Sequence, residues 1–397
     1  MAATVVLVAG CAQAPSPERA AACPAPPACP VLADCPACPP LKPPAAARYE
    51  PREFSALPGW AAGAQAAALR AFLTGCEPLP QSSPLKRACE EAKRAPQGED
   101  AAARRWFEGA FSAYAVIGPE GGAEGLITGY YEPVLSGSRR RGERFRHPVY
   151  GTPEDLVSVD LAAVAPETRH LRLRGRLEGR RLVPYWSRGE IEAGAMRAPV
   201  LAWVEDPVEL FFLQIQGSGL IELEHDGRRG EPIRLGYADQ NGHPYRSLGR
   251  HLIEQGKLTL ENASMQGIKA WAAANPAELQ EALSFNASYV FLRELPAHGG
   301  PIGALGAPLS AGASLAVDPR HIPLGAPVFL ATTFPLSERP LQRLMVAQDT
   351  GGAIRGAVRG DFYWGGGAEA GQQAGRMRQR GRFWLLWPRG EPLPRLQ

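Results

Sequence analysis

The sequence predicts a mainly β protein with helices, organised in two domains. Its 397 residues exceed the roughly 150 of an average domain. Glycine and proline are frequent, with 44 and 39 residues, and beyond Glu120 short apolar runs are separated by them and by charged residues. No G-x-G-x-x-G sequence follows a predicted strand, so these runs favour barrels or sandwiches over a doubly wound parallel sheet.

Charge and hydropathy exclude two broad classes of protein. Lys and Arg number 43 against 40 Asp and Glu, and a net charge of +3 is too balanced for a nucleic-acid binder that depends on a basic field. Beyond residue 12, no apolar run approaches the roughly 18 residues that a membrane-spanning helix needs. We therefore expect neither a nucleic-acid partner nor an integral membrane helix.

Residues 1–11 have the character of an export signal. The stretch is apolar and ends in small residues, Val8-Ala9-Gly10-Cys11, which resembles a bacterial lipobox. On this interpretation the signal is removed, Cys11 is lipidated, and Ala12 directs the protein to the outer membrane, where it is anchored facing the periplasm. The alternative is a chance cysteine at an ordinary N-terminus.

Residues 12–50 are predicted to form a proline-rich tether. Twelve prolines fall within residues 15–51 and favour extended polyproline conformations. The tether also holds four cysteines whose role the sequence does not explain: Cys23, Cys29, Cys35 and Cys38. Cys35 and Cys38 have C-x-x-C spacing, but the tract lacks the strand-to-helix context or compact loop of redox and zinc sites.

The two remaining cysteines, Cys76 and Cys89, lie in helix-like sequence. Their separation suits a bridge between two adjacent short helices. In an exported protein we expect a disulfide, whereas in a cytosolic one the pair would stay reduced.

Helical and strand patterns alternate along the remainder of the chain. Apolar residues recur at helical spacing in Trp60–Tyr114 and again in Tyr245–Leu283. Short apolar runs between turn signals predict strands at Leu126–Tyr131, Pro207–Gln216, Leu315–Val317, Pro327–Leu330 and Leu344–Ala347.

The absence of several motifs narrows the chemistry to carboxylates. The seven histidines are scattered and form no H-E-x-x-H or similar ligand spacing, so we predict no metal site and no cofactor. No G-x-S-x-G or P-loop sequence occurs, and no cysteine follows Cys89.

Three aspartates lie in unusual surroundings near the C-terminus. Asp318 and Asp349 each follow a predicted strand, and Asp361 precedes Phe362-Tyr363-Trp364. Aromatic neighbours are typical of a sugar-binding cleft, and apolar surroundings raise the pKa of a carboxyl group toward the range of a general acid. The alternative for each is a turn residue that caps a strand.

Asp349-Thr350-Gly351 also matches the D-T-G of aspartic proteases, which need two carboxylates sharing one proton. A second D-T-G or D-S-G is missing, so a single-chain protease is disfavoured.

Longer motifs resemble those of the membrane-bound lytic murein transglycosylase A family. The resemblance covers about residues 50–390 in order, and its segments are Leu126–Val134, Leu213–Gly219, Gly236–Gly249, Asn286–Phe291, Asp318, Asp349–Gly356, Asp361–Gly365, Glu369–Gly375 and Gly381–Leu386. It implies a double-psi β-barrel domain, residues 51–133 and 291–397, interrupted by a smaller inserted β-barrel-like domain, residues 134–290, with a cleft between them.

The resemblance also implies an activity. The family cleaves the β-1,4 bond between MurNAc and GlcNAc of peptidoglycan glycan strands without water, leaving a 1,6-anhydro-MurNAc end. Asp361 would be the general acid and then the base, and Asp349 and Asp318 would orient it or shape the developing positive charge. The residues expected to line the cleft are Thr128, Tyr131, Gln216, Gly217, Ser218 and Gly219. The alternative from another class is a non-catalytic glycan-binding lipoprotein.

Overall fold

The computed structural model describes residues 47–96, 98–161, 163–165, 168, 173–225, 228–296 and 299–394. The predicted signal, the predicted lipidation site Cys11 and the predicted tether up to residue 46 lie outside the described residues, as do Cys23, Cys29, Cys35 and Cys38. The predicted architecture, sheet-rich with helices, is confirmed.

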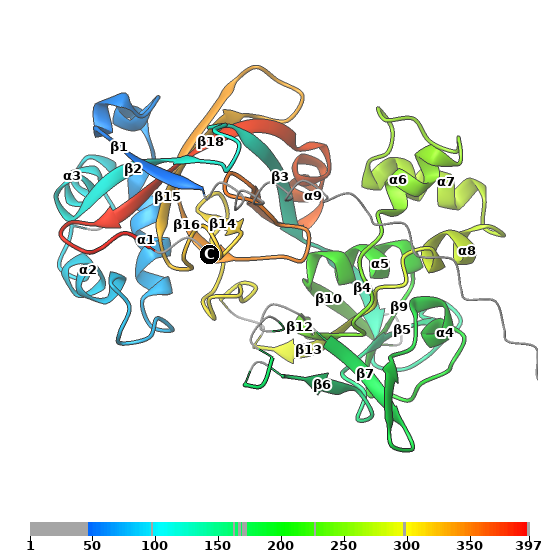
Figure 1. The fold of residues 1–397 in the computed structure, drawn as a ribbon. Coiled ribbons are helices and arrows are strands. Elements are labelled where there is room, and N and C mark those ends of the chain that lie inside the picture. The colour runs from blue at the N-terminus through cyan, green and yellow to red at the C-terminus, as the bar shows by residue number, and fades with distance from the viewer. Residues whose placement is uncertain are drawn as a thin grey trace, which may run out of the picture. The chain divides into compact units, whose positions relative to one another are not determined.

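A first sheet joins strands from both ends of the described chain (Figure 1). Its members are β1 (Arg48–Arg52), β2 (Phe111–Ile117), β3 (Gly125–Glu132), β14 (Ser314–Val317), β15 (Pro327–Thr333), β16 (Pro340–Asp349), β17 (Gly360–Gly366) and β18 (Arg378–Pro388). Their order is β1-β2-β18-β15-β16-β14-β17-β3, and β18 also pairs with β3, so the strands from β18 round to β3 close into a ring. Two pairings are parallel, β14 with β16 and β17 with β3.

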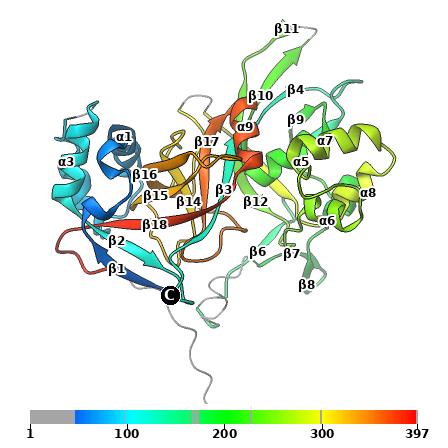
Figure 2. The ribbon, with the colours of Figure 1, turned by 90° about the horizontal axis from the view of Figure 1, so that it is seen from above.

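Helical segments cover parts of this sheet. They are η1 (Phe54–Ala56), η2 (Trp60–Ala62), α1 (Gln65–Gly75), α2 (Leu85–Ala92), α3 (Asp100–Ala110) and α9 (Gly367–Arg376). α1 contacts β16 and α2 contacts β18, whereas α9 lies against β3 and β17 (Figure 2). The largest apolar core lies between these helices and the strands, with Phe72, Phe107, Phe111, Phe329 and Phe383 buried in it.

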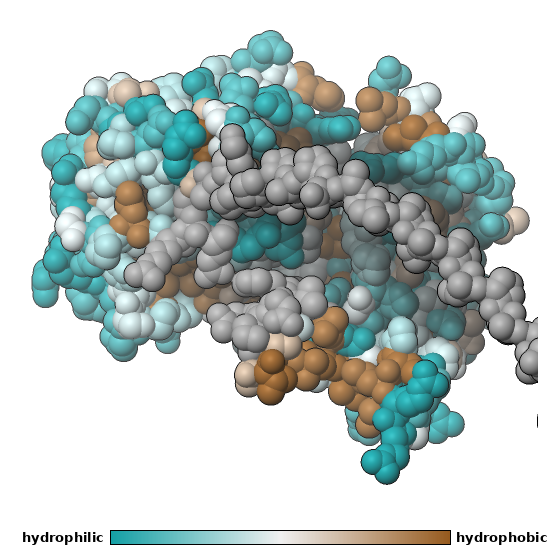
Figure 3. Space-filling model, viewed as in Figure 1, coloured by the Kyte–Doolittle hydropathy of each residue, from teal (hydrophilic) through white to brown (hydrophobic). Residues whose placement is uncertain are grey.

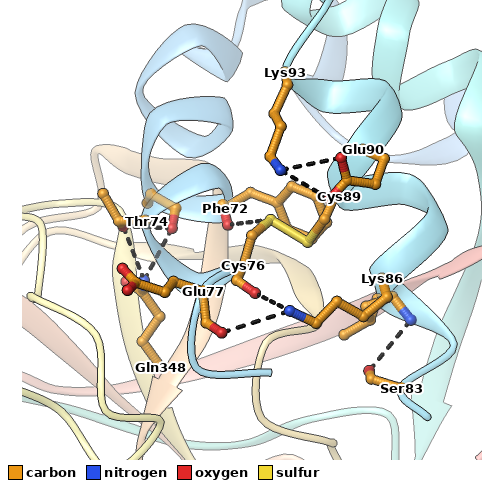
Figure 4. Close-up of a disulfide and its surroundings, with 12 residues drawn as sticks. Phe72, Thr74, Cys76, Glu77, Ser83, Lys86, Cys89, Glu90, Lys93 and Gln348 are labelled. Atoms are coloured by element: carbon orange, nitrogen blue, oxygen red, sulfur yellow. Dashed lines mark hydrogen bonds and ion pairs between the residues drawn. A yellow bond between two sulfur atoms is a disulfide. The ribbon is translucent and has the colours of Figure 1, made fainter. Parts of the chain in front are cut away.

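A disulfide joins Cys76, at the end of α1, to Cys89 in α2 (Figure 4). Lys86 of α2 donates a 2.8 Å hydrogen bond to the Cys76 carbonyl. On the other side of α1, the buried Gln348 donates a 2.9 Å hydrogen bond to the carbonyl of Ala71. The cross-linked helices thus support the end of β16, where Asp349 lies.

A second sheet is formed by the central part of the chain. Its strands are β4 (Val134–Ser138), β5 (His147–Tyr150), β9 (Val200–Val204), β10 (Ser218–His225), β11 (Arg228–Arg229), β12 (Ile233–Gln240) and β13 (Val290–Leu295), in the order β13-β12-β10-β4-β9-β5 with β11 beside β10. The accompanying helices are α4 (Arg188–Glu192), α5 (Pro207–Gln216), α6 (Leu248–Glu254), α7 (Met265–Ala274) and α8 (Leu279–Ser284). A small third sheet consists of β6 (Val157–Val159), β7 (Leu173–Glu178) and β8 (Arg181–Pro184).

The prediction of a strand at Pro207–Gln216 is wrong, because this segment is helix α5. The Asp206 side chain accepts hydrogen bonds from the backbone of Val208 and Glu209, Pro207 occupies the first turn, and Gly217 ends the helix with a φ of 73°. These are capping features of a helix, and they outweigh the β propensity of the apolar run.

Three boundaries also differ from those predicted. The predicted tether runs to residue 50, but β1 begins at Arg48 and pairs with β2. The predicted helical region runs to Tyr114, but β2 begins at Phe111. The insertion was expected to end at residue 290, but β13 continues to Leu295 within the second sheet. Each difference depends on pairing with a distant strand, which local periodicity does not show.

Candidate active site

Asp361 lies in β17 beside Thr128 of β3. The two residues are direct neighbours in the parallel pairing of these strands. The Thr128 hydroxyl donates a 2.6 Å hydrogen bond to Oδ1 of Asp361. It accepts a 2.9 Å hydrogen bond from Nη2 of Arg359. Because Arg359 can only donate, the Thr128 proton is directed to the Asp361 carboxyl group.

The surroundings of Asp361 change its acidity. Burial raises the pKa of Asp361 from its ordinary value of 3.8 to about 6. The hydrogen bond from Thr128 and the positive charge of Arg359 lower the pKa, and the negative charge of Asp349 adds to the rise. A carboxyl group with a pKa near neutrality can both donate and accept a proton during one reaction.

Asp349 ends β16, which is separated from the strand of Asp361 by β14. Both aspartates pair with Ala316 of β14, from opposite sides, so two inter-strand spacings, about 10 Å, separate them. Oδ1 of Asp349 accepts hydrogen bonds of 2.9 Å from the backbone amides of Ala304 and Thr350. Burial raises the pKa of Asp349, and these two amides act against the rise.

Tyr130 of β3 lies near both carboxyl groups. Its hydroxyl group is buried, makes no hydrogen bond of ordinary geometry to a described residue, and lowers the pKa of Asp349. Burial raises the pKa of Tyr130 well above its ordinary value, and the charges of Asp349 and Asp361 add to this. Its ring packs on Tyr363 with centroids 5.1 Å apart. Tyr130 therefore presents a neutral hydroxyl group beside two carboxyls.

Asp318 has a different environment from the other two aspartates. It is 1% exposed, and Arg320 donates to it from Nε at 3.0 Å and from Nη2 at 2.6 Å. The backbone amide of Gly356 donates a further 2.8 Å hydrogen bond. Burial alone would raise the pKa of Asp318, but these bonds outweigh it and hold the pKa at about 2. Asp318 thus stays ionised and fastens the segment between Asp349 and Asp361, and none of its hydrogen bonds reaches Asp361.

The other residues expected in the cleft lie where β3 meets α5 and β10. The Gln216 side-chain oxygen accepts a 3.1 Å hydrogen bond from the backbone of Tyr131, and the Tyr131 hydroxyl donates to the sulfur of Met265 at 3.0 Å. Gly217 ends α5. Ser218 and Gly219 begin β10, and a Cβ on Gly219 would lie 2.2 Å from the Leu213 side chain. Among the six expected residues, only Thr128 forms a hydrogen bond with Asp361, whereas Tyr131 and Gln216 join β3 to α5.

A pocket opens at this junction. It lies between β3 and α9 on one side and α5, α6 and α7 on the other, and its lining includes Gly129, Tyr131, Phe212, Gln216, Tyr245, Met265 and Gly371. Aromatic and amide groups together suit a polar ligand with apolar faces, as in a sugar.

A buried ion pair crosses between the sheets beside the pocket. Glu132, the last residue of β3, accepts hydrogen bonds of 2.7 and 2.9 Å from Nη1 of Arg234 in β12. Burial raises the pKa of Glu132, and Arg234 acts against this. The pair fixes β3 to the second sheet at the residue where the chain passes from one sheet to the other.

Within the described residues, no group of His, Cys, Asp and Glu is arranged to hold a metal ion. No described helix is long and apolar enough to cross a membrane.

The sequence prediction missed Arg359, Tyr130 and Glu132. Arg359 lies two positions before Asp361, and this spacing along an extended strand puts both side chains on one face. That spacing could have identified Arg359. Tyr130 and Glu132 lie inside a motif quoted above, but their partners are on distant strands.

Comparisons with known proteins agree with this fold. Residues 126–293 match the MltA specific insert domain, and residues 313–387 match the 3D domain. The membrane-bound lytic murein transglycosylase A of Escherichia coli (strain K12) is 37% identical over 276 residues, which cover 66% of this chain and 65% of that protein. The Vibrio cholerae protein of the same name is 31% identical, covering 67% and 66%. The match thus spans just under two thirds of the length of the Escherichia coli relative.

Solved structures extend the likeness over most of the described chain. MltA from Neisseria gonorrhoeae has a TM-score of 0.78 and 43% identity, covering 88% of this chain and 95% of that one. Escherichia coli MltA with bound chitohexaose has a TM-score of 0.60 and 29% identity, covering 86% and 91%. The combination of the MltA specific insert domain and the 3D domain places the chain in the class of lytic transglycosylases. The chain belongs to the membrane-bound lytic murein transglycosylase A family.

Proposed function

We propose that the protein is a peptidoglycan lytic transglycosylase that cleaves the β-1,4 bond between MurNAc and GlcNAc and forms a 1,6-anhydro-MurNAc end. The observation that carries the proposal is the state of Asp361, a carboxyl group with a pKa raised to about 6 and a hydrogen bond from Thr128. The solved Escherichia coli relative with bound chitohexaose supports a glycan chain as the ligand.

In the proposed reaction Asp361 acts twice. Protonated Asp361 gives its proton to the glycosidic oxygen while the bond from that oxygen to C1 of MurNAc breaks. The C6 hydroxyl of the same sugar then forms a bond to C1 and passes its proton to the Asp361 carboxylate, which restores the acid. Because the substrate supplies the nucleophile, a second catalytic carboxylate is unnecessary, in contrast to ordinary glycosidases.

The neighbouring residues support Asp361 in defined ways. Thr128 and Arg359 hold its carboxyl oxygen in place and stabilise the charged form after the first proton transfer. Asp349 lies on the far side of β14 from Asp361. Its negative charge favours the protonated form of Asp361 before the reaction and stabilises the positive charge that develops at C1. Asp318 fastens the segment that connects the two.

An aspartic protease is disfavoured by the same geometry. Such enzymes need two carboxyls close enough to share a proton. Asp349 and Asp361 are separated by β14, and Asp349 is bound to backbone amides.

The ring of strands supports a finer description of the fold. We propose that it is a double-psi β-barrel, since a closed ring with two parallel pairings joins segments from both ends of the described chain. The second sheet would be the inserted domain, and the pocket at β3, α5 and α7 would belong to the glycan-binding cleft.

We also propose that Cys11 carries a lipid that anchors the protein to the outer membrane on its periplasmic side. The relatives named as membrane-bound and the Cys76–Cys89 disulfide, which suits an oxidising compartment, support this location. Cys11→Ala should release the protein from the membrane fraction, and unchanged fractionation would refute the anchor.

The reaction type is tested by the products. Purified glycan strands digested by the protein should give fragments with 1,6-anhydro ends, which mass spectrometry distinguishes from reducing ends by the mass of one water. Reducing ends would show hydrolysis instead. Binding of strands without any cleavage would identify the alternative, a non-catalytic glycan-binding lipoprotein.

A further inference from the structure

The small sheet of β6, β7 and β8 has an apolar face directed away from the protein body. Residues that pair directly across strands project on the same face, and residues two apart along a strand do too. The pairings of Val157 with Gly175, Val159 with Leu173, Leu177 with Leu182 and Gly175 with Pro184 therefore define one face. Every side chain on this face is apolar.

The opposite face carries polar side chains, with Val183 as its one apolar residue, and two of its arginines contact the body. Arg174 forms a 2.8 Å ion pair with Asp239 of β12. Arg176 lies 3.7 Å from the centroid of the Trp186 ring. This arrangement reverses the usual amphipathic sheet, in which the apolar face is directed inward.

The apolar face is open to solvent. Leu177 is 63% exposed, Leu182 is 47% and Leu173 is 39%. None of them belongs to a hydrophobic cluster of the described residues. Figure 3 shows apolar surface over β6 and β7, next to a hydrophilic tip. A contiguous exposed apolar patch of a few hundred Å² is the size of the largest patch on a typical monomeric protein, and such patches are often functional.

The size of the face argues against a second copy of the chain as its occupant. Six residues of β7 extend for about 20 Å and three strands for about 14 Å, so the face covers on the order of 300 Å². A stable dimer buries about 800 Å² on each partner. The face also has no aromatic side chain on which a sugar ring could stack, so a glycan strand does not suit it.

The charged residues next to the apolar face indicate which kind of partner it binds. Arg180 lies in the turn between β7 and β8, and Arg181 follows it as the first residue of β8, opposite Glu178 on the other face at the tip of the hairpin; both arginines are exposed, and Glu178 also forms an ion pair with Arg176. Aliphatic side chains next to exposed arginines match the boundary between headgroups and acyl chains of an anionic bilayer, where the arginines meet the phosphates.

We propose that the β6–β7–β8 face binds the surface of an anionic phospholipid bilayer. The contact would be a second membrane attachment, separate from the proposed lipid on Cys11. It does not depend on the proposed glycan cleavage.

Vesicle binding by the full chain tests the proposal. The Cys11→Ala protein, which cannot be lipidated, is sedimented with vesicles of phosphatidylethanolamine and phosphatidylglycerol and with vesicles of phosphatidylcholine alone. We expect binding to the anionic vesicles, weakened about tenfold by Leu177→Ser with Leu182→Ser, because two exposed leucines lose their transfer into the bilayer. Arg180→Gln with Arg181→Gln should remove the preference for anionic vesicles.

Leu260→Ser is the matched control, since Leu260 is 70% exposed and lies between α6 and α7. It should leave vesicle binding unchanged, and thermal unfolding should show that all variants remain folded. Absence of vesicle binding, or equal binding by the Leu177→Ser/Leu182→Ser protein, would overturn the proposal. A dimer seen by light scattering and abolished by the same pair of changes would assign the face to a second copy and would also overturn it.

Discussion

Asp349 and Asp361 both pair with Ala316, one from each side of β14. The intervening strand keeps their backbones about two inter-strand spacings apart, and no hydrogen bond joins the two carboxyl groups, yet the charge of Asp349 raises the pKa of Asp361. The two aspartates therefore have different roles in the account. Asp361 donates and accepts the proton, and the negative charge of Asp349 raises the pKa of Asp361.

Thr128→Val should shift the pH dependence of cleavage. The Thr128 hydrogen bond lowers the pKa of Asp361, which burial has raised to about 6. Its loss raises this pKa further, so Asp361 stays protonated to higher pH and the alkaline limb of activity moves upward. The rate at the optimum should fall about tenfold, the effect of one hydrogen bond to a charged group. Thr333→Val on β15 is the control, and an alkaline limb that stays in place would contradict the assignment.

Asp318→Asn should reduce stability in a pH-dependent way. The pKa of Asp318 lies at about 2 in the folded protein, below its ordinary 3.8, so its stabilising effect is full above pH 4 and disappears as pH falls through 2. The Arg320 side chain is 43% exposed, so solvent screening limits the effect to about 1 kcal/mol. Urea unfolding should separate wild type from Asp318→Asn at pH 7, and the difference should shrink toward pH 2. Glu338→Gln, an exposed change, should show no such difference, and a gap that persists at pH 2 would contradict the account.

Glu132 and Arg234 should be energetically coupled. Each single change, Glu132→Gln or Arg234→Met, disrupts a buried ion pair and should lower the free energy of unfolding by about 3 kcal/mol. The double variant should lose less free energy of unfolding than the two single variants added together. Each single variant leaves one buried charge without its partner, whereas the double variant has neither charge. A double-mutant cycle measures this coupling, and simple additivity would show that the pair is not a unit.

The Cys76–Cys89 disulfide should stabilise α1 and α2. It closes a loop with a sequence separation of 13, for which loop entropy gives about 3 kcal/mol. Cys76→Ser with Cys89→Ser should lower the thermal midpoint, and dithiothreitol should lower that of wild type by a similar amount without affecting the variant. A wild-type midpoint that does not respond to the reductant would contradict this.

The sequence predicted the β-rich class because its strands are short apolar runs with turn signals, such as β3 and β15. It misassigned Pro207–Gln216, where the apolar run fits either a helix or a buried strand. The capping residues Asp206 and Gly217 at its two ends are the sequence signal that indicates a helix. The first three residues of β1, Arg48–Glu50, were placed in the tether because the segment is polar and becomes a strand only by pairing with β2.

At the site, Asp361 was predicted from its aromatic neighbours in the sequence and from the resemblance of the surrounding motifs to those of a known family. It could not give the cause of the raised pKa, which includes burial and the balance between Thr128, Arg359 and Asp349. Thr128 is 233 residues away in the chain, and only the register of β3 with β17 brings it to Asp361. Such cross-strand pairings cannot be read from local sequence.

The central claim is that Asp361 alone transfers the proton, and single-turnover digestion of glycan strands tests it most directly. Asp361→Asn keeps the shape of the side chain but cannot donate and recover a proton. It should therefore lose at least about a thousandfold in rate, whereas Asp318→Asn, measured at a temperature where it is folded, should retain most of the wild-type rate. Anhydro-product formation by Asp361→Asn at the wild-type rate would contradict the account.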